Sequence, residues 1–150
     1  MFGFGDALST YLNDHLAGAT LGVNLARRLA GDSEVLSAVA DEIEEDRQAL
    51  VEVMERLSVR QDRIRVAVAW GAEKVLRYSP LNRLEELEAL SLGVEGKLAL
   101  WRTLSHTLAA DPRLDGVDLD DLVARAQSQR RRLERQRMSA AEQALTADSR

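Results

Sequence analysis

The sequence contains no cysteine and only two prolines. Without cysteine the chain has no disulfide, no thiolate metal ligand and no cysteine nucleophile. The aromatic content is 4%, and Ala, Leu, Glu, Arg, Gln and Val dominate the remainder. This composition favours helices, and no convincing strand pattern or internal repeat interrupts it. The sequence therefore predicts an all-α protein.

Long hydrophobic runs and a positive net charge are also missing. No apolar stretch approaches the roughly 18–20 residues that a transmembrane helix needs. The opening segment, residues 1–6, lacks the basic start and long apolar centre of a secretory signal, so we expect a cytoplasmic protein. A net charge of -5 argues against nucleic-acid binding, because phosphates attract a basic surface. Arginine greatly outnumbers lysine, which is typical of a GC-rich bacterial genome.

Apolar residues at helical spacing divide the 150 residues into four long helices and one shorter helix within a single domain, 1–150. Gly31 is expected to end the first helix, and Asp32 or Ser33 to cap the second. Pro80 suits the first position of the third long helix, and Asp118 caps the last. The long helices are predicted over residues 6–30, 33–57, 80–110 and 118–147, and the short one over residues 58–78. The expected fold is a four-helix bundle.

A carboxylate is predicted inside this bundle, on the second helix. At about 100° per residue, with Ile43 at the centre of the apolar stripe, Asp46 falls about 60° away. Glu42 falls about 100° away, at the edge of the stripe. An unpaired buried carboxylate is costly, so Asp46 needs a partner.

His15 is the partner that the sequence suggests. It lies 16 residues before Gly31, and Asp46 lies 15 residues after it, so a tight helical hairpin brings both to the same height. We expect a buried hydrogen-bonded pair. Small residues beside His15, including Gly18 and Gly22, are expected to let a neighbouring helix come close.

The order of elements, a helical hairpin followed by a long connection and a second hairpin, resembles the ferritin-like family. The resemblance implies that the short helix crosses over, so that the second and third long helices run parallel. This topology places Glu95 of the third long helix at the same level of the bundle as Asp46. It places Arg130 or Glu134 of the fourth helix at that level as well. The implied mid-bundle layer holds His15, Asp46, Glu95, and Arg130 or Glu134, with Glu42 nearby. The alternative is an up-down bundle in which the short helix is a fifth member.

Two functional interpretations follow from this layer. Metal-binding members of the ferritin-like family carry a Glu on two helices and Glu-x-x-His on the other two. Neither Glu-x-x-His is present, so an oxygen-activating di-iron centre is not expected. A single iron, manganese or zinc ion on His15, Asp46 and Glu95, with Glu42 or Glu134 as a further oxygen ligand, remains the alternative. The preferred interpretation is a structural polar core without catalytic residues, since Arg130 would supply the positive charge that a metal brings.

Two of the helices carry apolar residues on a second side as well. A helix that is apolar on two sides has two neighbours, so the second side predicts a homo-oligomer interface or a docking surface for another protein. The sequence therefore predicts a non-catalytic bundle that acts through protein contacts, with metal storage or metal-dependent redox chemistry as the alternative. The second-side residues are Leu21 and Leu25 on the first helix, and Leu90, Leu100, Trp101, Leu104 and Leu108 on the third.

Overall fold

The computed structural model describes residues 4–63 and 80–146, and these form an all-α bundle, as predicted. A short 3-10 turn, η1, links the last two helices, and no strand occurs in the described ranges. None of the described helices is apolar enough over a sufficient length to span a bilayer. The elements are α1 (Phe4–Ala30), α2 (Glu34–Arg56), α4 (Pro80–Thr107), η1 (Pro112–Leu114) and α5 (Leu119–Thr146).

The helix ends carry the residues that the sequence assigned to them. Gly31 follows α1 with φ +46°, a left-handed conformation that glycine adopts without strain. The Ser33 hydroxyl accepts a hydrogen bond from the Leu36 N–H at 3.2 Å and caps α2. The Asp118 carboxylate accepts one from the Asp121 N–H at 2.9 Å, which caps α5. Local capping chemistry thus fixes three of the helix boundaries.

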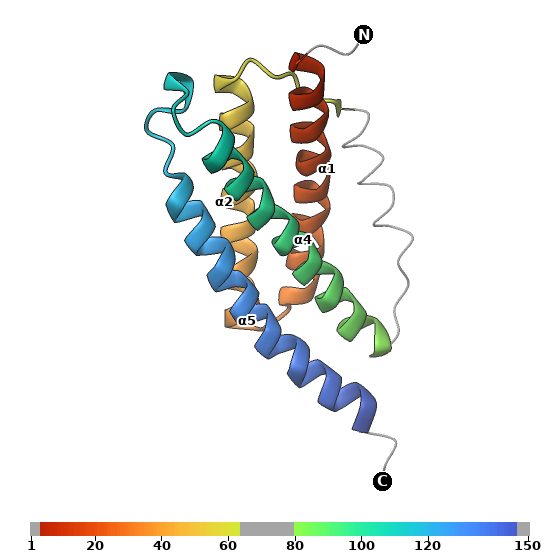
Figure 1. The fold of residues 1–150 in the computed structure, drawn as a ribbon. Helices are drawn as coiled ribbons and strands as arrows, with labels where there is room; N and C mark the ends of the chain where they lie inside the picture. Colours follow the sequence, from red (N-terminus) through yellow and green to blue (C-terminus); the bar gives the residue numbers. More distant parts are fainter. Residues whose placement is uncertain (1–3, 64–79, 147–150) are drawn as a thin grey trace.

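The bundle consists of two antiparallel hairpins, α1–α2 and α4–α5, packed one over the other (Figure 1). Arg28 near the end of α1 pairs with Glu86 near the start of α4 at 2.9 Å, so these helices are antiparallel. It follows that α2 and α4 run in the same direction, the relation that the ferritin-like resemblance implies. The predicted crossover and most of the predicted short helix fall on residues 64–79, outside the described residues.

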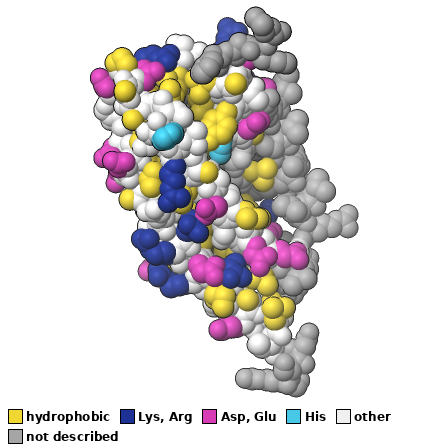
Figure 2. All heavy atoms as spheres, viewed as in Figure 1, with side chains coloured by type: hydrophobic (Ala, Val, Ile, Leu, Met, Phe, Trp, Pro, Cys, Tyr) yellow, Lys and Arg dark blue, Asp and Glu magenta, His cyan; other side chains and the backbone are white. Residues whose placement is uncertain are grey.

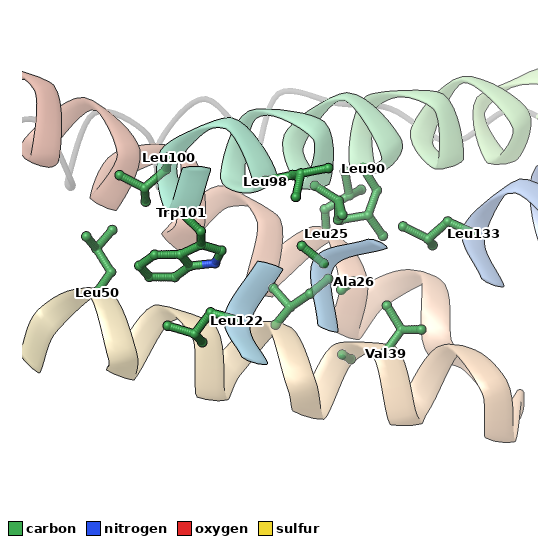
Figure 3. Packing of buried hydrophobic residues seen from close by; sticks show 14 of the residues in the cluster. Leu25, Ala26, Val39, Leu50, Leu90, Leu98, Leu100, Trp101, Leu122 and Leu133 are labelled. Atoms are coloured by element: carbon green, nitrogen blue, oxygen red, sulfur yellow. The ribbon is translucent and has the colours of Figure 1, made fainter. Parts of the chain in front are cut away.

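The core is built from the predicted apolar stripes, and it also takes up residues that we expected on the outside (Figure 3). Leu90, Leu100, Trp101 and Leu104 are all buried, so the predicted outer docking surface on α4 is wrong. The reason is that α4 packs against both α1 and α5, and both of its apolar sides are used within the chain. Among the described residues, the exposed large hydrophobic side chains are Val35, Leu92, Met138 and Leu145.

Candidate functional site

Asp46 lies in the core, with 1% of its surface exposed. Lys97 of α4 places its Nζ 2.5 Å from Asp46 Oδ2, and Gln129 of α5 donates to the same oxygen at 2.9 Å. Arg125 of α5 donates to Oδ1 from Nε at 2.8 Å and from Nη2 at 2.5 Å. Both carboxylate oxygens are therefore occupied by donors from the opposite hairpin.

The charged groups continue along the interface between α2 and α5. Arg125 also pairs with Glu45 at 2.9 Å. About two turns further along α5, Arg132 makes two hydrogen bonds with the Glu42 carboxylate, at 2.6 and 2.8 Å. The Asp46 cluster, as we call it, comprises Glu42, Glu45, Asp46, Lys97, Arg125, Gln129 and Arg132. Its three carboxylates and three cations cancel, so the cluster is neutral as a whole.

The pKa values of the cluster follow from burial and pairing. Hydrogen bonding to Arg132 holds the pKa of Glu42 below its usual value, and the same contact raises the pKa of Arg132. This pair is therefore ionised at neutral pH. Burial lowers the pKa of Lys97, and the adjacent Asp46 carboxylate opposes that change. The cost of burying the Lys97 ammonium is thus offset by the carboxylate that it contacts.

His15 does not belong to this cluster. It lies on α1, half-buried, with its ring edge-on to the ring of Tyr11 at a centroid distance of 4.8 Å. Burial lowers its pKa, although Asp14 opposes the change, so the imidazole is neutral at pH 7. His15 and Asp46 do line the same cavity, as their common height suggested. The predicted hydrogen bond between them is wrong, because α4 and α5 supply the donors to Asp46.

The other members of the predicted layer lie on the outside. Glu95 and Arg130 form a surface ion pair at 2.5 Å, with 51% and 48% of their side chains exposed. Glu134 is exposed and pairs with Arg137 on its own helix at 2.7 Å. The inner position on α5 belongs to Gln129, and one residue further turns Arg130 about 100° away. The mid-bundle layer was therefore wrong in helical phase on α4 and α5.

The predicted metal ligands are not assembled in this structure. Within residues 4–63 and 80–146, no three His, Asp or Glu side chains come together in an arrangement that could hold a metal ion. Around Asp46 and Glu42, an ammonium and guanidinium groups occupy the positions that a cation would need. The donor set of the Asp46 cluster therefore does not fit zinc, iron or manganese.

The sequence contained signals for the residues that we missed. Leu90, Lys97 and Leu104 recur at intervals of seven, so Lys97 belongs to a buried stripe of α4. Gln129 lies between Ala126 and Leu133 on the inner stripe of α5. Lys97 on α4 and Gln129 on α5 are thus polar residues within apolar stripes. This pattern indicates that both side chains face the core, where Asp46 lies.

A cavity of about 290 Å³ lies between α1 and α4, with α2 as its floor. Glycines line both walls: Gly18 and Gly22 on α1, and Gly93 and Gly96 on α4. A Cβ atom added at any of them would meet nothing within 4 Å. At Gly18 and Gly22, therefore, no neighbouring helix among those described comes as close as the small residues would allow. They leave space between the helices.

Comparisons with known proteins bring no further information on this site. No protein-family model matches the chain, and no curated protein or solved structure matches it.

Proposed function

We propose that this chain is a non-catalytic, ferritin-like helical-bundle protein that works through protein contacts. The internal neutrality of the Asp46 cluster supports a structural role: Asp46 accepts from Lys97, Gln129 and Arg125 and has no free oxygen for a substrate or a metal. The parallel course of α2 and α4 supports the ferritin-like topology. Most of the predicted second-side residues are buried, and Leu21 and Leu108 are half-buried, so we look for the contact surface elsewhere.

The outward side of α5 carries the observation on which this proposal rests. Five residues recur there at intervals of three and four, and so share one face of the helix. Met138 and Leu145 in this set are 48% and 65% exposed. In Figure 1 the last turns of α5 extend past the ends of α1 and α2, and Figure 2 shows charges of both signs among hydrophobic side chains on this side of the molecule. This α5 stripe comprises Arg131, Arg135, Met138, Glu142 and Leu145.

A second copy of this chain is the partner that fits the α5 stripe. In an antiparallel pairing of two α5 helices about Met138, Arg131 of one copy lies opposite Leu145 of the other, and Arg135 comes within one residue of the position opposite Glu142. Arg131, Arg135 and Glu142 have no ion-pair partner among the described residues, so their charges are available. A stripe that carries both signs and apolar residues is complementary to itself, as a two-fold interface requires.

Light scattering coupled to size-exclusion chromatography tests this proposal. We expect a dimer for the native chain and a monomer for Met138→Glu with Leu145→Glu. Arg135→Glu should weaken the dimer, and adding Glu142→Arg should restore it, because the swap preserves opposite charges. Val35→Glu is the matched control, since Val35 is 41% exposed on α2 and outside the stripe. A native monomer at all concentrations, or dissociation by Val35→Glu alone, would refute self-association through α5.

A further inference from the structure

The cavity between α1 and α4 is separate from the α5 stripe and is of a size that binds small molecules. A cavity of about 150 Å³ holds benzene, so the 290 Å³ here accommodates roughly a dozen non-hydrogen atoms. Most of the wall is apolar, which excludes a strongly hydrophilic ligand. The principal apolar residues of the wall are Leu25, Ile43, Leu90, Val94 and Leu100.

Arg47 is a cation on this wall that forms no ion pair with any carboxylate of the described residues. Its Nε donates to the Thr20 hydroxyl at 3.1 Å, and that hydroxyl donates to the Leu16 carbonyl at 3.0 Å. This chain of hydrogen bonds orients the guanidinium. No carboxylate among the described residues pairs with Arg47, whereas Lys97, on the same wall, is paired with Asp46. The wall thus carries two cations, Arg47 and Lys97, and two carboxylates, Asp14 and Asp46, and the Arg47 guanidinium is the cation without an ion pair among the described residues.

Trp101 supplies a second group without a partner. The residue lines the cavity and is 0% exposed, and its indole N–H has no hydrogen-bond acceptor in the part of the chain that the structure describes. In Figure 3 the indole nitrogen is turned toward the side of the core where Leu25 and Leu90 lie, and both of these leucines belong to the cavity wall. A buried N–H without an acceptor is costly, so an acceptor atom in the cavity would satisfy it.

We propose that the cavity binds a small amphipathic monocarboxylate, with its carboxylate on Arg47 and its hydrocarbon part against the leucines. A planar guanidinium matches a carboxylate with two parallel hydrogen bonds, and its Nη atoms are free for this. One carboxylate gives the Arg47 guanidinium an ion-pair partner, while a second would be buried without a cation of its own.

Titration calorimetry with octanoate, compared with octan-1-ol as a neutral probe of nearly equal length, tests the proposal. The native chain should bind octanoate more tightly than the alcohol. Arg47→Gln should weaken octanoate binding by roughly tenfold or more, the value of a charge-assisted hydrogen bond, and leave the alcohol unchanged. Arg27→Gln is the matched control, because Arg27 is an exposed arginine that pairs with Asp41 outside the cavity. It should bind octanoate as the native chain does.

A second variant locates the binding. Gly22→Leu places a side chain in the open space of the cavity and should abolish binding of both probes while the helical circular dichroism stays native. Octanoate binding that persists in Gly22→Leu would place the ligand elsewhere and overturn the proposal. Equal affinities for octanoate and octan-1-ol, no effect of Arg47→Gln, or no binding of either probe to the native chain would overturn it as well.

Discussion

Replacing Asp46 by alanine removes an acceptor that several donors of the core share. Lys97, with 13% of its side chain exposed, loses its carboxylate partner and keeps Gln129 Oε1 as an uncharged acceptor. Gln129, fully buried, loses the acceptor of its amide group. Arg125 can still pair with Glu45, which limits the loss on the solvent side. Breaking a buried ion pair from one side costs about 3–5 kcal/mol, because an uncompensated charge remains inside.

Urea denaturation followed by circular dichroism measures this change in the free energy of unfolding. For a domain of this size, 1 kcal/mol corresponds to about 2–4 °C, so Asp46→Ala should also lower the melting temperature by roughly 6–20 °C. Asp41→Ala is the control: Asp41 is 65% exposed and pairs with exposed Arg27. Its loss should cost less than about 1 kcal/mol.

The same reasoning makes an opposite prediction for a fully apolar replacement. Asp46→Leu combined with Lys97→Met and Gln129→Leu removes the buried charges together, so it should be about as stable as the native chain or more stable. A cost below about 1 kcal/mol for Asp46→Ala would refute the argument. So would a triple variant that is no more stable than Asp46→Ala.

Three further changes test other parts of the structure. Glu42→Gln should destabilise the protein at neutral pH, because the pKa of Glu42 in the native protein lies below its usual value of 4.5. The stability difference between the native chain and the variant should be present above pH 4.5 and disappear as the pH falls through the lowered pKa of Glu42. Acid titration of both proteins measures this difference. Gly93→Ala should raise the free energy of unfolding by up to about 1 kcal/mol, because the added Cβ meets open space and alanine favours helix. Glu95→Gln should cost less than about 1 kcal/mol, since its pair with Arg130 is exposed; a loss comparable to that of Asp46→Ala would contradict the surface placement.

The helices and the burial of Asp46 were predictable because they depend on local rules. Capping by Ser33 and Asp118, the stop at Gly31 and the apolar spacing are properties of single helices. Helical phase alone turned Asp46 toward the core.

The partners of Asp46 were not predicted, because they depend on how each helix is rotated about its axis. An error of one residue rotates a side chain by about 100°, which is the difference between Gln129 in the core and Arg130 on the surface. Long side chains add a further difficulty: Lys97 and Arg125 reach Asp46 from other helices, over distances that spacing along the sequence does not encode. For this reason the sequence placed His15 at the same level of the bundle as Asp46, but wrongly predicted a hydrogen bond between the two.

Metal binding is the measurement that tests the structural role of the Asp46 cluster most directly. The purified chain is incubated with zinc, manganese or ferrous iron, desalted and examined by native mass spectrometry, beside Asp46→Asn and Glu42→Gln. Since cations of the chain itself occupy both carboxylates, we predict no stoichiometric metal in the native protein and no difference between it and the variants. Near-stoichiometric metal that is lost in Asp46→Asn would contradict the account and make the cluster a metal site.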